Sequence, residues 1–222
     1  EAQTTHTIDY LRERDSENPF CLFLSWGPPH HPYRLVPEEY LDQYDLDAIE
    51  GRPNCPDVPR EDLWGYFAQT TFLDDQFQRL IDAIADMGLD DDTIIVFSSD
   101  HGDMHGSQGV YKKQWPWNEA IKVPFAIRYP DVISSGARLD APISVIDVMP
   151  TLLGLAGVPI PDTVEGVDLS PVLRGERTTP PESVLIMNPC PFSIGDKRGF
   201  DQYPDYKGKR LEYRGVITAQ YT

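Results

Sequence analysis

The stretch TIIVFSSDHGDMHGSQGVYKK, residues 93–113, decides which fold the chain is expected to adopt. It begins with Thr93–Phe97, a largely apolar run of the kind that forms a strand buried on both faces. Polar groups follow at once, with Asp100 and His101 first and a pair of lysines at the end. In α/β sheets, ligands bind beyond the carboxyl ends of the strands. The stretch therefore predicts a functional site at the end of a strand.

The segments on either side predict an α/β fold. A second apolar run, Phe20–Trp26, predicts another strand buried on both faces. Apolar residues at helical intervals predict a helix over about residues 61–87, ended by Gly88. Strand, long helix and strand in this order are typical of a right-handed crossover. We expect a mostly parallel, mixed sheet flanked by helices. Also expected are strands at 123–129 and 184–187, a helix at 146–155 ended by Gly157, and a long loop at 188–209.

The composition excludes several classes of partner. The 222 residues carry a net charge of −17, which argues against nucleic acid and anionic membrane surfaces as partners. No apolar run approaches the roughly 20 residues that cross a bilayer. The three cysteines show no C-x-x-C spacing and predict neither a zinc site nor a disulfide framework. Periplasmic, secreted and cytoplasmic locations all stay open, and the first two are favoured.

Two residue types at the strand end suit a divalent cation. The Asp100 carboxylate and the His101 imidazole are good ligands, and neighbouring glycines let the backbone bend around an ion. Two ligands are too few for a complete site, so other segments must contribute. An ordinary polar turn is the alternative interpretation.

Two further groups are expected near this cation. His30 and His31 follow the predicted strand Phe20–Trp26, so they should reach the same edge of the sheet. Lys112 and Lys113 bring positive charge that would hold a tetrahedral anion beside a metal. The alternatives are structural histidines and an exposed lysine pair.

Seven segments, in sequence order, resemble motifs of the type I sulfatases, the formylglycine-dependent branch of the alkaline phosphatase superfamily. Four of them match a family pattern: P-P-H-x-P-[YF] at 28–33, L-D-D-Q-x-x-R-L at 73–80, S-D-H-G-[DE]-M at 99–104 and E-x-x-[KR]-V-P-F at 119–125. The other matched segments are 127–130, 147–151 and 165–169. Within 73–80, Gln78 replaces a customary glycine. The resemblance implies an alkaline phosphatase/sulfatase-like fold and the hydrolysis of a sulfate monoester.

The resemblance also implies roles for individual residues. Asp100 and His101 would ligate the cation, commonly Ca²⁺, with Mn²⁺ or Mg²⁺ as alternatives. Lys113 and His30 would act in catalysis and contact the sulfate, with His30 near the leaving-group oxygen. Lys112 is the alternative to Lys113. The remaining substrate-binding candidates are His31 and His105.

The substrate implied by the resemblance is a small aryl or sugar sulfate. Trp115 and Trp117 are candidates to stack on it, with packing as the alternative. Gln108 stands where many relatives have His, which weakens the contact expected at that position.

One part of the family pattern has no match in this chain. The nucleophile of the family is a formylglycine made from a C-x-P-S-R motif, and Cys21, Cys55 and Cys190 do not fit that motif. The aspartate pair of the first strand is also unmatched. We therefore expect residues 1–187 to be the central part of the α/β domain, with the nucleophile in a missing N-terminal part. Residues 188–222 would be a long loop and the start of a small C-terminal subdomain.

Two alternative functions stay open at this point. One is a phosphodiester or phosphonate monoester hydrolase of the same superfamily, which handles a similar tetrahedral anion. The other is a catalytically inactive module that binds a metal or a sulfated ligand.

Overall fold

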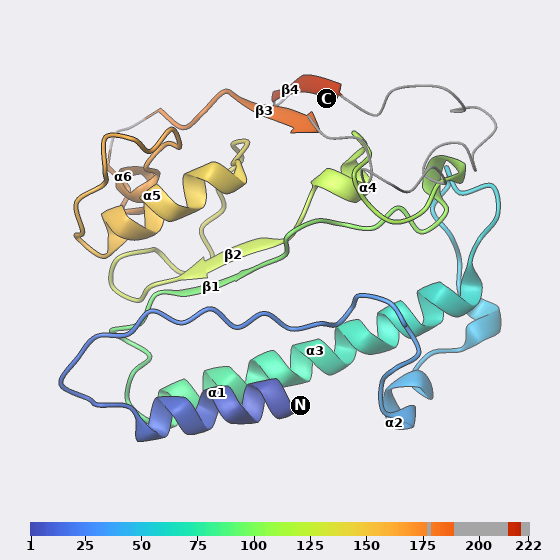
Figure 1. Cartoon of the computed structure of the whole chain (residues 1–222), viewed down its shortest axis with the longest axis horizontal. Helices are drawn as coiled ribbons and strands as arrows, with labels where there is room; N and C mark the ends of the chain where they lie inside the picture. Colours follow the sequence, from blue (N-terminus) through green and yellow to red (C-terminus); the bar gives the residue numbers. More distant parts are fainter. Residues whose placement is uncertain (177–178, 189–212, 219–222) are drawn as a thin grey trace. The chain divides into compact units, whose positions relative to one another are not determined.

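The computed structural model describes residues 1–176, 179–188 and 213–218, and these fall into two compact units. Unit 1 comprises residues 1–91 and 103–112, and unit 2 comprises residues 92–102 and the described residues from 113 onward. Figure 1 shows the elements of both units. The stretch quoted above therefore belongs to both units, because the chain leaves unit 2 after Gly102 and returns to it at Lys113.

Unit 1 is built on one long helix, α3 (Arg60–Asp86), and this confirms the helix predicted at 61–87. The helix ends as predicted at Gly88, whose φ of 65° is left-handed. There Gly88 N–H donates to Ala85 O at 2.8 Å and Leu89 N–H to Ile84 O at 3.0 Å, the two bonds of a Schellman motif. The other helical elements of unit 1 are α1 (Ala2–Glu13), α2 (Glu38–Leu41), η1 (Leu46–Ala48) and η2 (Ser107–Gly109).

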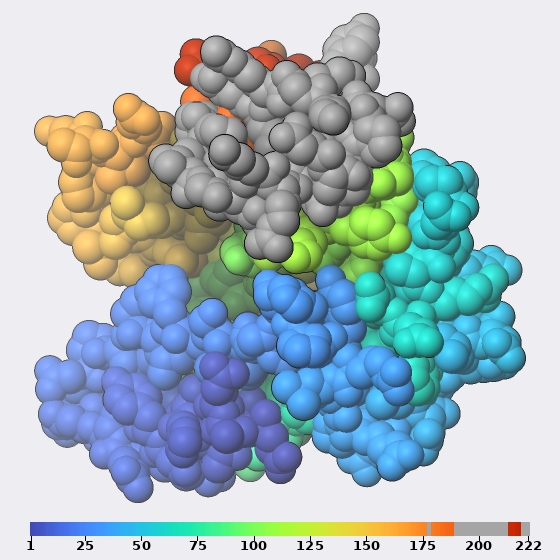
Figure 2. Space-filling model, turned by 45° about the vertical axis from the view of Figure 1, so that its right-hand side comes forward, coloured from blue at the N-terminus to red at the C-terminus, as the bar shows by residue number. Residues whose placement is uncertain are grey.

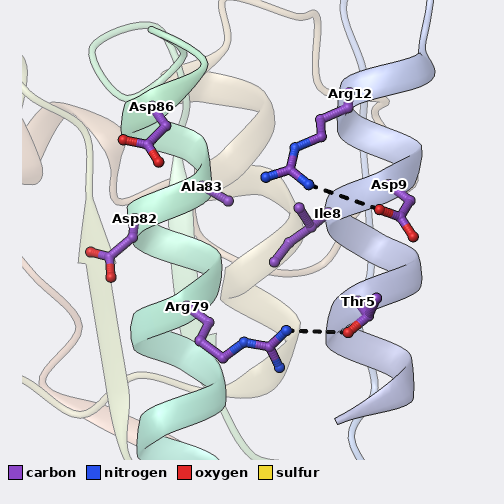
Figure 3. A pocket seen from close by; sticks show the side chains of 8 residues that line it. All are labelled: Thr5, Ile8, Asp9, Arg12, Arg79, Asp82, Ala83 and Asp86. Atoms are coloured by element: carbon purple, nitrogen blue, oxygen red, sulfur yellow. Dashed lines mark hydrogen bonds and ion pairs between the residues drawn. The ribbon is translucent and has the colours of Figure 1, made fainter.

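Helix α1 packs against α3, and a shallow pocket lies between them (Figure 3). The Arg79 guanidinium donates to Thr5 Oγ1 at 3.2 Å across this contact. The pocket lining includes Arg12 from α1 and the carboxylates of Asp82 and Asp86 from α3. None of the candidate site residues lines it, so we interpret it as a charged surface groove of the helix pair.

The predicted strand Phe20–Trp26 is extended but forms no strand ladder in the described part of the chain, so that prediction is wrong. Its even-numbered residues are half-buried, and Trp26 Nε1 donates to Thr4 Oγ1 of α1 at 3.0 Å. On the opposite face Phe23 is 89% exposed. An apolar run indicates that a segment seeks burial, but it does not specify a partner strand, and here helices cover one face. Figure 2 shows atoms of the N-terminal part of the chain, coloured blue, on one face of the molecule.

Unit 2 contains two two-stranded sheets (Figure 1). The predicted strands at 93–97, 123–129 and 184–187 form β1 (Ile95–Ser98), β2 (Phe125–Arg128) and β3 (Ser183–Asn188). A further strand, β4 (Tyr213–Thr218), pairs with β3. Both pairs are antiparallel, with Ile95 opposite Arg128 and Ser183 opposite Thr218. The expected parallel pairing is therefore absent from the described residues. The segment Phe20–Trp26, which was expected to lie parallel to the strand at 93–97, joins no ladder.

Helix α5 (Val145–Leu155) confirms the helix predicted at 146–155, and Gly157 ends it with a φ of 67°. Asp147 is 4% exposed and uses both carboxylate oxygens. It accepts from Ser144 N–H at 2.8 Å and from Val167 N–H at 2.8 Å. The matched segments 147–151 and 165–169 thus hold each other in place. Unit 2 also contains α4 (Asn118–Ile121) and α6 (Ser170–Leu173).

Some predictions fall outside the described residues. The long loop expected at 188–209 lies there from residue 189 onward, together with Cys190. The division expected between residues 187 and 188 stays a prediction. Within the described ranges, every helix is too short or too polar to cross a membrane.

Candidate active site

Asp100 and His101 lie just beyond the end of β1, after Ser99, and their side chains are neighbours. The Asp100 Oδ1 atom accepts from His101 N–H at 3.0 Å, and Ser99 Oγ donates to His101 O at 2.9 Å. These local bonds fix the backbone at the strand end. The Asp100 side chain is 84% exposed and the His101 side chain 32% exposed, so both are accessible to an ion or a substrate.

The tautomer of His101 follows from its neighbours. His101 Nδ1 lies 2.8 Å from Gly102 O. A carbonyl oxygen accepts only, so Nδ1 carries the proton and the lone pair of the neutral ring is on Nε2. Nε2 lies 3.4 Å from Asp100 Oδ2, which also presents a lone pair. A cation or a proton placed between these two atoms would satisfy both. A backbone carbonyl that fixes Nδ1 is also the usual support of a metal-binding histidine.

The spacing of these two atoms fits one edge of a cation's coordination sphere. Ligand atoms at right angles around an ion with bonds of about 2.1–2.5 Å lie about 3.0–3.5 Å apart. The 3.4 Å between Nε2 and Oδ2 falls within this range. Among the described residues, no group of three or more His, Cys, Asp or Glu side chains is placed to hold a metal. The structure thus brings the two predicted ligands together, and their role in binding a metal stays a prediction.

The glycine of the D-H-G motif is required by a close backbone contact. Gly102 N–H donates to Ala120 O at 2.8 Å, and a Cβ at Gly102 would overlap the carbonyl oxygen of Glu119. The backbone of α4 thus lies directly against the residue that follows His101. This contact links the D-H-G motif to the E-x-x-[KR]-V-P-F motif.

We expect Gly102→Ala to destabilise the protein by about 1–3 kcal/mol, the usual cost of overpacking a close contact. The added methyl group must displace the Glu119 backbone, and His101 Nδ1 would lose its fixed carbonyl partner. Chemical denaturation measures the free energy of unfolding. Gly27→Ala is a matched control, because nothing lies within 4 Å of a Cβ there and its φ is not in the left-handed region. Equal losses in the two variants would contradict the close-contact explanation.

Lys113 lies in a segment of unit 2 whose backbone is anchored by the C-terminal sheet. Lys112 and Gln114, on either side of it, have positive φ values of 66° and 75°. Asn188 Nδ2 donates to Gln114 O at 3.4 Å, and the Tyr213 hydroxyl donates to Trp115 O at 3.3 Å. Burial raises the pKa of Tyr213, so this hydroxyl keeps its proton. The path of the chain around Lys113 is therefore fixed on its C-terminal side.

Trp115 and Trp117 pack rather than present a sugar-binding face. Their rings stack with centroids 5.3 Å apart, and Trp115 is 3% exposed. This favours the packing alternative for Trp115.

His30 and His31 lie in unit 1, in the turn that follows the extended segment. Their rings are 4.2 Å apart, and His30 Nδ1 lies 2.8 Å from His31 O. By the same reasoning as for His101, Nδ1 carries the proton and Nε2 is the basic nitrogen of the neutral ring. His30 is exposed, as a group that acts on a substrate must be.

His105, in contrast, is a buried residue of unit 1. It is 5% exposed, and its ring lies 4.5 Å from the Tyr66 ring and 5.1 Å from the Tyr33 ring. Its Nε2 is buried without a hydrogen-bond partner, 3.9 Å from Asp103 Oδ1. Burial lowers the pKa of His105, which keeps the ring neutral. The predicted role in substrate binding stays a prediction, but this burial favours a supporting role.

The candidate residues divide between the two units. Asp100, His101 and Lys113 belong to unit 2. The three other histidines, His30, His31 and His105, belong to unit 1, where Tyr33 contacts the rings of both His31 and His105.

Sequence reasoning missed three residues that support the His30 segment. The Tyr33 hydroxyl donates to Asp103 Oδ2 at 2.9 Å, and Gln69, 2% exposed, donates to Pro32 O at 2.9 Å. Tyr33 and Asp103 both lie within matched family motifs, and this could have identified them from the sequence as candidates for the site. Gln69 gave a different signal, because it is a polar residue on the buried side of a helix.

Of the two described cysteines, Cys21 is exposed and Cys55 is packed among backbone groups. Cys21 and Cys55 are both reduced, and the Cys55 thiol contacts Asp57 O at 3.3 Å and His105 O at 3.6 Å. These contacts agree with the sequence analysis, in which neither cysteine fits the nucleophile motif.

Comparison with known proteins identifies the family. Residues 1–158 match the family model described as Sulfatase. The chain is 36% identical over 218 residues to an ulvan-active sulfatase of Formosa agariphila, covering 95% of this chain and 40% of that protein. A solved structure from work on glycosaminoglycan metabolism by Bacteroides thetaiotaomicron superposes with a TM-score of 0.82 at 30% identity, covering 97% of this chain and 46% of that one.

A third comparison bears on the alternative chemistry. The phosphonate monoester hydrolase of Agrobacterium radiobacter shares the fold, with a TM-score of 0.77 at 22% identity over 97% of this chain and 51% of that one. The chain spans about half or less of the length of the curated relatives it matches. These matches confirm the predicted α/β fold class of the sulfatases.

Proposed function

This chain belongs to the sulfatase family, and from that premise we propose that the protein hydrolyses sulfate monoesters. The observation that carries the proposal is the pair of facing acceptors at the end of β1. His101 Nε2 and Asp100 Oδ2 lie 3.4 Å apart, a spacing that two ligands of one cation can have. The bond from His101 Nδ1 to Gly102 O supports this arrangement by fixing the tautomer.

Asp100 and His101 would hold a divalent cation, with Ca²⁺ as the first candidate and Mn²⁺ or Mg²⁺ as alternatives. The bound cation would neutralise negative charge on the sulfate oxygens. The carboxylate oxygen suits all three ions, whereas the imidazole nitrogen is a softer ligand that suits Mn²⁺ better than Ca²⁺. The choice of metal is therefore a point for measurement.

Lys113 and His30 are proposed to be the catalytic residues that contact the sulfate. The Lys113 ammonium would supply positive charge to the sulfate oxygens, and His30, once its Nε2 has taken up a proton to form the imidazolium, would give that proton to the departing alcohol oxygen. His31 and His105 are proposed to support substrate binding, His105 from its buried position beside Tyr33. A formylglycine outside this chain would supply the nucleophile.

The proposed substrate class is an aryl or sugar sulfate. The matched relative from Formosa agariphila is named for its activity on ulvan, and this supports a sulfated saccharide. A location in the periplasm or outside the cell would suit such a substrate.

The second candidate is the hydrolysis of phosphonate monoesters or phosphodiesters. The shared fold of the Agrobacterium radiobacter enzyme favours it, because the same elements can position groups for either tetrahedral anion. The greater identity to sulfatases ranks it second.

Paired kinetics separate the two candidates. We expect the protein, expressed from its complete reading frame, to turn over 4-nitrophenyl sulfate with a larger kcat/KM than 4-nitrophenyl phenylphosphonate. Release of 4-nitrophenolate measures both reactions in one buffer with added Ca²⁺ or Mn²⁺. A larger kcat/KM for the phosphonate would reverse the ranking, and no turnover of either ester, with cation binding retained, would favour the inactive binding module.

A further inference from the structure

We propose that Asp103, acting through the Tyr33 hydroxyl, is a positioning residue for the proton donor His30. The inference rests on the proposed function and adds a residue pair to it. All of the residues concerned belong to unit 1.

Asp103 is an almost buried carboxylate with both oxygens engaged. Its side chain is 17% exposed. Oδ1 accepts from His105 N–H at 3.0 Å, and Oδ2 accepts from the Tyr33 hydroxyl at 2.9 Å. Hydrogen bonds to an ionised acceptor are about twice as strong as those between neutral groups. Burial and the adjacent Asp103 charge raise the pKa of Tyr33, so the hydroxyl remains a donor.

The backbone of Tyr33 lies in close contact with α3. The helix presents Gly65 at this point, and a Cβ there would lie 2.7 Å from Tyr33 O. Gln69, one turn further along, donates to Pro32 O at 2.9 Å. Tyr33 is thus fixed at its backbone by α3 and at its hydroxyl by Asp103, so its ring has one orientation.

This fixed ring lies next to the histidine pair. Its centroid is 6.2 Å from that of His31, and the His31 ring is 4.2 Å from that of His30. The His31 carbonyl in turn accepts from His30 Nδ1 and determines the tautomer of His30. When Tyr33 is fixed, the His31 carbonyl is fixed, and His30 Nε2 keeps the orientation needed to donate a proton.

The test compares two tyrosines of the same cluster. Tyr33→Phe removes the hydroxyl that binds Asp103, whereas Tyr66→Phe removes a hydroxyl from the other ring that packs on His105. Sulfate esters with poor leaving groups need the proton donor, and 4-nitrophenyl sulfate needs it little. We expect Tyr33→Phe to lower kcat/KM for a sugar sulfate by about 10–100-fold, a part of the usual contribution of an acid catalyst. For 4-nitrophenyl sulfate the expected loss is roughly threefold or less, and Tyr66→Phe should leave the ratio of the two rates unchanged.

Equal losses on both esters in Tyr33→Phe would overturn the proposal, because a merely structural tyrosine would give that result. The proposal would also be overturned if Tyr66→Phe changed the ratio of kcat/KM for the two esters as much as Tyr33→Phe does. Asp103→Asn provides a second variant with the same shape, and it is expected to give the same selective loss on the sugar sulfate.

The tautomer of His30 offers a readout that does not depend on turnover. Long-range ¹H–¹⁵N spectra of the wild type should show His30 protonated at Nδ1, and Tyr33→Phe should shift it toward a mixture of tautomers. An unchanged His30 spectrum in a folded Tyr33→Phe protein would overturn the proposal. If the wild type hydrolyses neither ester, the proposed function fails, while the spectra still decide whether Tyr33 positions His30.

Discussion

Replacing His101 with alanine is expected to remove the stabilisation that divalent cations give and to lower kcat/KM for 4-nitrophenyl sulfate by more than about 100-fold. Loss of a group that merely supports a metal ligand costs about 10–100-fold, and loss of the ligand itself should cost more. His101 Nε2 is one of the two acceptors that face each other at the end of β1. Without it, Asp100 would be left as a single exposed carboxylate.

Thermal denaturation with and without Ca²⁺ or Mn²⁺ measures the first part of this prediction. A cation at about 100 times its dissociation constant should stabilise the wild type by about 2.7 kcal/mol. We expect His101→Ala to lose this increase in Tm. His6→Ala is the matched control, because His6 is an exposed histidine of α1 in unit 1. A full cation response in His101→Ala would show that the ion binds elsewhere.

Replacing Lys113 with alanine is expected to lower kcat/KM for sulfate esters by about 10²–10³-fold. This is the usual cost of removing one group that stabilises charge in the transition state. The chain is acidic overall, with a net charge of −17, so an anionic substrate depends on local cations of this kind. Steady-state kinetics on 4-nitrophenyl sulfate measure the loss, and inhibition by inorganic sulfate should weaken in parallel.

Lys112→Gly is the comparison that decides between the two adjacent lysines. Lys112 has a φ of 66°, a conformation that glycine adopts more readily than lysine, so this substitution suits the backbone. We expect a change in kcat/KM of roughly threefold or less, a small fraction of the loss assigned to Lys113. If Lys112→Gly shows the large loss and Lys113→Ala does not, the assignment moves to Lys112.

The elements that the sequence predicted well are those whose signals are local. Helix α3 has apolar residues at helical intervals, and Gly88 ends it by adopting the left-handed conformation. The segment Phe20–Trp26 was wrongly predicted as a paired strand because pairing depends on a partner far along the chain. Its apolar composition is explained as well by packing of Trp26 against α1.

The same distinction holds for the candidate site. Asp100 and His101 are neighbours in the sequence, so their joint placement was predictable. The bond between Tyr33 and Asp103 joins residues 70 positions apart, and no local pattern indicates it. His105 was named as a substrate-binding candidate on the family resemblance. Its burial between Tyr33 and Tyr66 depends on the fold of unit 1.

The central claim is that Asp100 and His101 hold a catalytic divalent cation, and anomalous diffraction from crystals grown with Mn²⁺ tests it most directly. The account predicts an anomalous peak within bonding distance of both Asp100 Oδ2 and His101 Nε2, with His101 Nδ1 still bonded to Gly102 O. A peak bound by other residues, or Nε2 hydrogen-bonded as a donor with no metal beside it, would contradict the account.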